Sequence, residues 1–341
     1  MSVDHIIAIL AIVLAVGFDF VNGFHDTANA VATVIYTKCL KPGVAIVMAG
    51  ILNFLGALLV GTAVAQVITK IIPPDAVSLP IVVAVLLAAL IWNLITWWFG
   101  IPVSSSHCLI ASLFGAGVMA AGVKGVEWHE LWYVLSGLLL SPIAGFLAGA
   151  AMTWLALKIS NEKEKDEQKA PPQVMRWLHI ISSASVSFSH GSNDGQKTMG
   201  LITLILATHF AEYGYQINHV PFWVMALAAT AMASGTVIGG WRVIRTVGTK
   251  ISRERLTHSQ GFGASMSTAL IILAASNLGA PISTTHTLSS AVAGGTLSAH
   301  GSKKLNPNTL KLLALAWILT IPIAAALAAV CYLILKLVWH S

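Results

Sequence analysis

The sequence has few charged residues and few cysteines. Only 9% of its 341 residues are Asp, Glu, Lys or Arg, whereas an ordinary soluble domain has about 25%. Hydrophobic residues make up 56% and the mean hydropathy is +0.80, which excludes a soluble globular protein and predicts an integral membrane protein. The three cysteines are scattered and lack CxxC spacing, which argues against a disulfide framework and a thiolate metal site.

Two further features of the sequence bear on its class, the start of the chain and the placement of its basic residues. The amino terminus, MSVDH, has no basic n-region before its apolar run, so no cleavable signal peptide is expected. The basic residues behind the net charge of +6 lie between apolar runs, where charge sets the membrane topology. Nucleic acid is therefore not an expected partner, and the lipid bilayer is.

Apolar runs divide the chain into two halves of five predicted spans each, because a span needs about 20 apolar residues. The spans of the first half are residues 5–37, 44–69, 78–99, 101–122 and 130–157. Those of the second half are residues 179–212, 221–241, 260–279, 281–299 and 309–337. A charged, proline-punctuated cytoplasmic linker at 158–178 separates a first transmembrane repeat at 1–157 from a second at 179–341.

Five crossings per half is an odd number, so the second half is predicted to be inverted relative to the first. With the amino terminus outside, 15 of the 19 Lys and Arg residues are cytoplasmic and three are external, which is the bias expected of cytoplasmic loops. Both termini are then external. The predicted fold is an all-α polytopic membrane protein with two inverted-topology repeats. The segments after Pro102 and Pro281 either cross the membrane or re-enter it.

Two segments with ionisable residues repeat at an offset of 168 residues, as 20–29 (FVNGFHDTAN) and 188–197 (FSHGSNDGQK). Ionisable groups are costly inside a membrane and mark a pathway or a site, and a matched pair is typical of a repeat-built transporter. The glycines in both segments predict broken helices, near residues 22–25 and 191–195. A purely structural alternative, two polar faces that hold the bundle together, is disfavoured because hydroxyls do so at a lower desolvation cost.

Polar residues at spacings of 3, 4 and 3 share one helix face in each segment. The first copy contributes Asp19, Asn22, Asp26 and Asn29, and the second contributes Ser187, His190, Asp194 and Lys197. The candidate residues for ion or proton coupling are Asp26, Asp194, Asn29, Asn193, His25, His190, Asn22 and Asp19. No resident metal and no cofactor are predicted, although Asp26 and Asp194 are candidate ligands for a transported cation.

Hydroxyl-rich segments also repeat, as residues 102–107 (PVSSSH) and 281–286 (PISTTH). Proline and Ser or Thr favour the first turn of a helix, where unpaired backbone N–H groups and the helix dipole attract anions. The candidate substrate-binding residues are Ser104, Ser105, Ser106, Ser283, Thr284, Thr285 and Lys197. Simple capping of two buried helices is the alternative. The closing histidines, His107 and His286, are weaker candidates.

These two sets of residues conflict electrostatically. Helix N-termini, hydroxyls and Lys197 favour a compact oxyanion, but Asp26 and Asp194 repel an anion until protons or cations neutralise them. The conflict predicts coupling, because the anion and its cation bind well only together. The coupling cation is a proton, a sodium ion or a divalent metal ion that travels with the anion.

At these residues the chain resembles the Pit family of inorganic phosphate transporters. Both acidic segments (23–30 and 191–198) and both hydroxyl segments occur in the family's order, and the resemblance covers nearly the whole chain. It implies a homodimer of inverted-repeat subunits that moves orthophosphate, or a neutral metal–phosphate complex, with a driving cation. It also implies that Asn29 and Asn193 are ion ligands and that residues 104–106 and 283–285 are phosphate ligands.

The chain departs from the pattern of sodium-coupled members, which is GxNDxxN in both halves. His25 precedes Asp26, and Lys197 stands where the first half has Asn29. A fixed ammonium replaces a sodium ion and repels it. We therefore expect import of phosphate across the cell membrane by proton symport. Sodium coupling is one alternative, and a permease for sulfate or another tetrahedral oxyanion is the other.

Two further classes of function are disfavoured. An intramembrane hydrolase would use a serine, a histidine and an aspartate, but the serines lack a GxSxG turn. Duplication of every polar element also suits two moving halves better than a single active site. A channel is disfavoured by the two opposed, charge-mismatched segments. No enzyme activity is expected.

Overall fold

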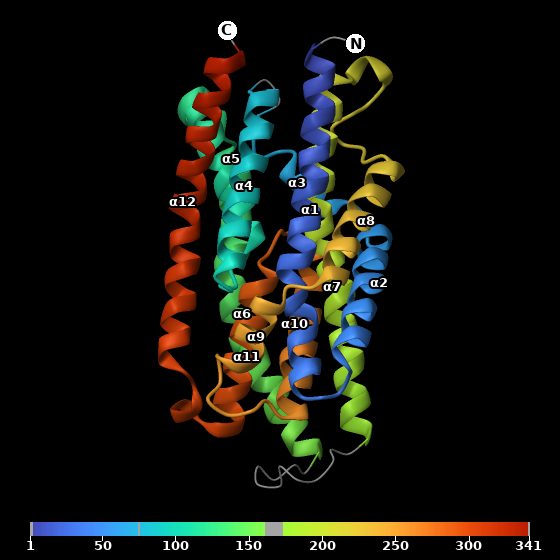
Figure 1. Cartoon of the computed structure of the whole chain (residues 1–341), viewed down its shortest axis with the longest axis vertical. Coiled ribbons are helices and arrows are strands. Elements are labelled where there is room, and N and C mark those ends of the chain that lie inside the picture. The colour runs from blue at the N-terminus through green and yellow to red at the C-terminus, as the bar shows by residue number, and fades with distance from the viewer. Residues whose placement is uncertain (1–2, 74–75, 161–172, 340–341) are drawn as a thin grey trace.

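The computed structural model describes residues 3–73, 76–160 and 173–339, which form an elongated bundle of helices (Figure 1). The helices of the first half are α1 (Val3–Tyr36), α2 (Pro42–Leu59), α3 (Ala63–Ile68), α4 (Leu79–Trp98), α5 (Ser105–Ala121) and α6 (Trp128–Ser160). Those of the second half are α7 (Gln173–His209), α8 (Phe222–Ile238), α9 (Trp241–Thr249), α10 (His258–Asn277), α11 (Thr284–His300) and α12 (Pro307–Trp339). The predicted all-α fold is confirmed.

The two halves contain the same succession of helices. α4 and α10 both have 20 residues, α5 and α11 both have 17, and α6 and α12 both have 33. α1 begins and α12 ends at the upper end of the bundle, whereas α6 ends and α7 begins at the lower end (Figure 1). α1 and α7 therefore run in opposite directions, as inverted repeats require.

The predicted breaks in the first helix of each half are wrong. α1 and α7 continue without interruption through residues 22–25 and 191–195. Their glycines allow close helix packing instead. A Cβ atom on Gly23 would lie 2.1 Å from the carbonyl oxygen of Met232 in α8, and one on Gly191 would lie 2.0 Å from that of Asn53 in α2. The backbone amides therefore stay in the helical hydrogen-bond ladder.

The breaks lie in the next span of each half. The predicted span 44–69 is divided into α2 and α3, and the predicted span 221–241 ends where α8 bends by 70° into α9. Gly61 and Gly239 have φ values of +93° and +76° at these breaks, a conformation that favours glycine. α3 packs against α7 and α9 packs against α1. Each short helix thus adjoins one of the helices with ionisable residues.

The segments after Pro102 and Pro281 belong to helical hairpins. The N–H of Glu127, just before α6, donates to the carbonyl oxygen of Ile71, which precedes α4. The α4–α5 pair therefore starts and finishes at the same end of the bundle. The N–H of Arg253, before α10, likewise donates to the carbonyl oxygen of Lys304, after α11. The four helices correspond to the predicted spans 78–99, 101–122, 260–279 and 281–299, and each pair enters and leaves the bundle at one end.

The helices differ in how closely they resemble ordinary membrane spans. Six helices of the described chain are long and apolar enough to cross a membrane, or seven if α8 and α9 count as one span. α7, α10 and α11 are not among them, because they are rich in serine and threonine, and most of these side chains lie inside the bundle. α6 and α12 are the most exposed spans and present leucines and isoleucines outward, as lipid-facing helices do.

The two halves interlock. α11 of the second half packs against α6, and α5 of the first half packs against α12. α7 packs against α1 and α2. Each hairpin is thus held by a helix of the other half. The ends of the predicted linker belong to α6 and α7, and its middle, residues 161–172, lies outside the described residues.

Candidate functional site

The tips of the two hairpins meet inside the bundle. Ser104 and Ser283 are the N-cap residues of α5 and α11, and each hydroxyl accepts a hydrogen bond from the N–H three residues later, at 3.1 and 3.0 Å. The capping interpretation therefore holds for these two serines. Ser106 Oγ donates to the carbonyl oxygen of Ile282 at 2.9 Å. Two helix N-termini, each with a partial positive charge, lie side by side.

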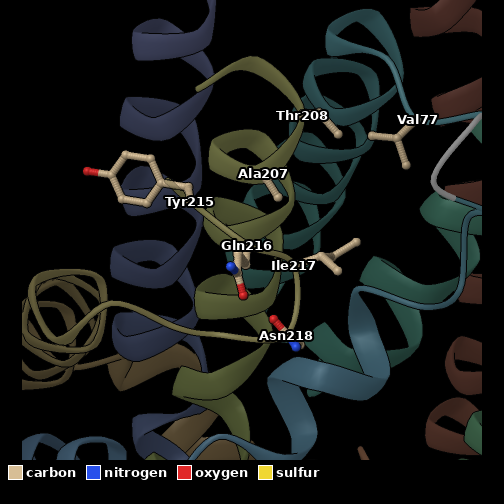
Figure 2. Close-up of a pocket in the computed structure, with 7 residues that line it drawn as sticks. All are labelled: Val77, Ala207, Thr208, Tyr215, Gln216, Ile217 and Asn218. Atoms are coloured by element: carbon tan, nitrogen blue, oxygen red, sulfur yellow. The ribbon is translucent and has the colours of Figure 1, made fainter. Parts of the chain in front are cut away.

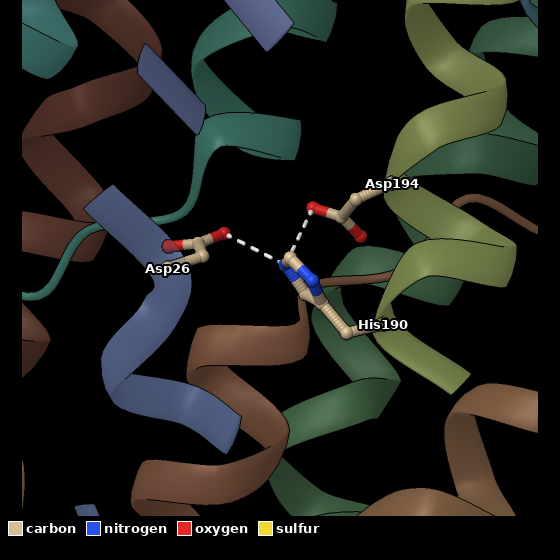
Figure 3. Close-up of side chains that lie close together, drawn as sticks. All are labelled: Asp26, His190 and Asp194. Atoms are coloured by element: carbon tan, nitrogen blue, oxygen red, sulfur yellow. Dashed lines mark ion pairs between the residues drawn. The ribbon is translucent and has the colours of Figure 1, made fainter. Parts of the chain in front are cut away.

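α1 and α7 bring together Asp26 and Asp194, the aspartates at equivalent positions of the two repeated segments (Figure 3). His190 lies between them, with its Nε2 3.7 Å from Asp26 Oδ2 and 3.7 Å from Asp194 Oδ2. One ligand atom from each of the three residues lies within 4.8 Å of the other two, and each side chain is at most 2% exposed. The predicted convergence of the acidic segments is therefore present, and the three groups are close enough to hold one cation.

The hydrogen bonds behind His190 fix which ring nitrogen carries a proton. Its Nδ1 lies 3.1 Å from Asn53 Oδ1, and Asn53 Nδ2 donates to Thr236 Oγ1 at 2.9 Å. Thr236 in turn donates to the carbonyl oxygen of Met232. Because the Asn53 amide is oriented by Thr236, its oxygen faces His190 and Nδ1 is the donor. Nε2 therefore presents either a lone pair or a second proton to the two carboxylates, and a lone pair there requires a cation.

Asp26 also contacts the hairpin of the other half. Thr285 Oγ1 donates to Asp26 Oδ1 at 3.0 Å. Asn29 Nδ2 donates to Thr285 Oγ1 at 2.9 Å and to Thr284 Oγ1 at 3.3 Å. α1 of the first half thus supplies a carboxylate and an amide to the hydroxyls that begin α11 of the second half.

Lys197 makes the equivalent connection from α7 to the first hairpin. Its Nζ lies 2.7 Å from Asp194 Oδ1, donates to Ser106 Oγ and is 3.5 Å from the carbonyl oxygen of Ile282. Where α1 offers the amide of Asn29, α7 therefore offers a fixed ammonium. At this pair of positions the two halves of the site differ by one positive charge.

Asn193 takes a different place from the one predicted for an ion ligand. Its Nδ2 donates to Ser276 Oγ and to the carbonyl oxygen of Ala280, both at 3.1 Å, and its Oδ1 accepts from the N–H of Ile282 at 3.3 Å. These bonds hold the turn between α10 and α11. In this structure Asn193 orients the hairpin tip.

The remaining candidates border the centre. His25 Nδ1 lies 3.4 Å from Asp26 Oδ1, and its Nε2 lies 3.4 Å from Thr96 Oγ1 in α4. Ser105 Oγ is buried and has no hydrogen-bond partner in the described part of the chain. Asp19 and Asn22 are likewise buried and unpartnered, on the face of α1 that bears Asp26.

Sequence reasoning missed two buried amides. Asn53 orients His190, as described above. Gln196 Oε1 accepts from the N–H groups of Val64 at 2.8 Å and Ala65 at 3.4 Å, at the start of α3. An asparagine within the apolar run of α2 was a usable signal, because an amide in a membrane span needs a partner. Nothing in the sequence indicated that Gln196 would face another helix.

The site is closed in this structure. A cavity of about 680 Å³ lies where α7 ends, beside Thr208, Tyr215 and Asn218 (Figure 2). A second cavity of about 450 Å³ lies beside Lys70 and Glu127. The candidate residues line neither cavity, and all of them are at most 2% exposed.

Comparisons with known proteins agree on one family. The model of a family described as the phosphate transporter family matches residues 22–328. A probable low-affinity inorganic phosphate transporter of Bacillus subtilis is 41% identical over 99% of this chain and 100% of its own length. The corresponding protein of Rhizobium meliloti is 38% identical over 96% of each chain. A solved structure described as the sodium-dependent phosphate transporter has a TM-score of 0.84 and 28% identity, covering 97% of this chain and 99% of its own.

Proposed function

We propose that this chain, which belongs to the phosphate transporter family, imports inorganic phosphate across the cell membrane together with a proton. Relatives with this fold and this degree of identity are transporters, so the expectation that the chain is not an enzyme is confirmed. The observation that carries the proposal is the meeting of two capped helix N-termini with a pair of buried aspartates.

Phosphate would bind at the hairpin tips. A compact anion suits two helix N-termini, because each offers free backbone N–H groups and the positive end of its dipole. The hydroxyls of Ser105, Ser106, Thr284 and Thr285 add donors, and the Lys197 ammonium adds a full positive charge. The hydroxyls come from both halves, so bound phosphate would hold the two hairpins together.

A cation would bind beside the phosphate, between Asp26 and Asp194. A negative charge about 4 Å from an anion costs about 4 kcal/mol at an effective dielectric constant of about 20. This cost corresponds to on the order of a thousandfold in affinity. Phosphate and the cation would therefore each bind weakly alone and strongly together, which is the requirement for symport.

A proton suits this centre better than a sodium ion does. Sodium prefers oxygen ligands, whereas His190 offers a nitrogen and Lys197 already places a positive charge on Asp194. The solved relative is described as sodium-dependent, so sodium coupling is the main alternative. A divalent metal ion that enters with phosphate is a further alternative, because one imidazole and two carboxylates suit such an ion.

We also propose a homodimer with both termini outside. The excess of basic residues in the predicted cytoplasmic loops supports this orientation. α1 begins and α12 ends at the same end of the bundle, so both termini lie on the same side of the membrane in this orientation (Figure 1). Labelling of tags at either end in intact cells tests the orientation, and the mass in detergent tests the dimer.

The proposed function is tested in proteoliposomes that contain the purified protein. Uptake of labelled phosphate is measured while the pH, sodium and magnesium gradients are varied independently. We expect an inward proton gradient to drive accumulation without sodium, and unlabelled phosphate to compete far better than sulfate. Equal uptake from a sodium gradient alone would contradict proton coupling, and equal competition by sulfate would contradict selectivity for phosphate.

A further inference from the structure

Asp19 is a buried acid outside the cluster of Asp26, His190 and Asp194. It lies on α1, is 0% exposed, and neither of its oxygens has a hydrogen-bond partner among the described residues. The side chains of Asn22 on α1 and Thr198 on α7 lie beside it. Both amide atoms of Asn22 and the hydroxyl of Thr198 are also buried and unpartnered.

The three buried aspartates differ in the positive charge near them. Asp194 has the Lys197 ammonium at 2.7 Å, and Asp26 has the His190 imidazole at 3.7 Å. Asp19 has no basic group within ion-pair distance in the ranges that the structure describes. A buried carboxylate that no ion pair neutralises is far less stable than the neutral acid, so such a group takes up a proton.

We propose that Asp19 loads the transported proton and passes it to the centre formed by Asp26 and Asp194. The inference rests on the proposed function, proton-driven import of phosphate. The proton would come from external water, form an O–H bond at a carboxyl oxygen of Asp19, pass to the centre as that bond breaks, and leave to cytoplasmic water on the other side. The neutral acid can donate to Asn22 Oδ1 or to Thr198 Oγ1, two buried acceptors that lie beside it without another partner among the described residues.

The position of Asp19 separates the proton from the phosphate. Asp19 precedes Asp26 by seven residues, which is about 10 Å along a helix that rises 1.5 Å per residue. Asp19 is nearer than Asp26 to the start of α1, and α1 starts at the end of the bundle that is external in the proposed orientation (Figure 1). The proton site and the phosphate site are therefore neighbouring but distinct.

Lys197 connects the two sites electrostatically. The charged groups that act on Asp19 are Lys197 and Asp194, both on α7. An ionised Asp19 would attract the Lys197 ammonium away from Ser106, whereas a protonated Asp19 leaves it beside that hydroxyl. Loading the proton thus favours the arrangement that binds phosphate, and this preference is reciprocal.

The experiment compares Asp19→Asn with the wild type in proteoliposomes. One readout is exchange of labelled for unlabelled phosphate at equal pH, and the other is accumulation driven by an outside-acid gradient with the membrane potential clamped. For one proton per phosphate, one pH unit supports up to about tenfold accumulation. We expect Asp19→Asn to continue exchange but to accumulate no more phosphate than without the gradient. A pH-sensitive dye inside the vesicles should show that phosphate no longer brings protons in.

Two control variants accompany the Asp19→Asn experiment. Ser187 is the equivalent residue of the second half, is equally buried, and donates to the carbonyl oxygen of Ser183 at 3.0 Å. We expect Ser187→Ala to retain both phosphate exchange and gradient-driven accumulation. Asp19→Glu, which keeps the carboxyl group, should retain gradient-driven accumulation. If Asp19→Asn fails to insert, Asp19→Ser takes its place in the same measurements.

The outcomes are distinguishable. Gradient-driven accumulation by Asp19→Asn at the wild-type level would overturn the assignment of the proton to Asp19. Loss of exchange together with accumulation would also overturn it, because Asp19 would then be needed for phosphate binding or folding. If the wild type itself exchanges phosphate but does not respond to the pH gradient, proton coupling fails, and the assignment of Asp19 fails with it.

Discussion

At the scale of single residues, Lys197 distinguishes the two halves of the site. Its ammonium lies 2.7 Å from Asp194, in the place where the first half has the neutral Asn29. The sequence already indicated this asymmetry, because the two residues occupy equivalent positions in the repeated segments. The contact with Ser106 was not predictable, since it joins α7 to a hairpin about 90 residues away.

Lys197→Asn should change the cation that drives transport. The substitution removes a fixed positive charge and leaves an amide oxygen near Asp194, so sodium or another small cation gains a place there. We expect phosphate uptake by the wild type to depend only weakly on sodium. Uptake by Lys197→Asn should require sodium. Uptake in proteoliposomes with and without sodium measures this.

Lys197→Met serves as the matched control for that change. It also removes the ammonium but supplies no oxygen ligand, so added sodium should not restore its uptake. Both variants break the buried ion pair with Asp194, so each should be about 3–5 kcal/mol less stable than the wild type. An unchanged cation dependence in Lys197→Asn would contradict the role assigned to Lys197.

Asp26→Asn should nearly abolish phosphate uptake while leaving the fold intact. The amide keeps the size of the side chain and one oxygen for the Thr285 hydroxyl, but it removes the negative charge that faces His190. The symport cycle then lacks its cation. Uptake in vesicles measures the loss, and size-exclusion chromatography in detergent measures folding. Uptake at the wild-type rate would remove Asp26 from the mechanism.

At the scale of helices, the sequence predicted the polar faces but misplaced the breaks. The spacing of Asp19, Asn22, Asp26 and Asn29 put these residues on one helix face, and α1 is a helix throughout. The glycines that suggested a break are explained only by α2 and α8, whose backbones approach within contact distance. Local sequence cannot tell a glycine that frees the backbone from one that admits a neighbouring helix.

Gly23→Ala should therefore destabilise the protein. The added methyl group would lie 2.1 Å from a carbonyl oxygen of α8, so α1 and α8 must move apart. Overpacking of this kind costs about 1–3 kcal/mol. Gly17→Ala is the control, because no atom lies within 4 Å of its added Cβ and alanine favours the helix. Thermal unfolding in detergent compares the two, and equal melting temperatures would contradict the packing role.

At the scale of the whole molecule, the two halves are held together by their own packing. α6 packs against α11, and α12 packs against α5, so each hairpin lies against a long helix from the other half. The sequence predicted two repeated halves, but not this exchange of contacts. Which half covers which hairpin depends on tertiary packing that a repeated motif does not specify.

A protein cut between the halves should stay assembled. A protease site placed within residues 161–172 separates the chain into two fragments, but the contacts of α5 with α12 and of α6 with α11 remain. We expect the fragments to co-purify through a tag on one of them and to retain phosphate uptake after cleavage. Separation of the fragments in mild detergent would show that the linker, rather than the interlocked helices, holds the halves together.

The exchange of hairpins has an evolutionary consequence. Asn29 reaches hydroxyls of the second half, and Lys197 reaches one of the first, so neither half has a complete pocket of its own. A half-length ancestor would have needed a second, oppositely inserted molecule before it could select any cargo. Joining two such copies in one chain would make that partnership permanent and let each copy mutate separately. A lysine in one copy and an asparagine in the other is a difference that identical partners could never have acquired.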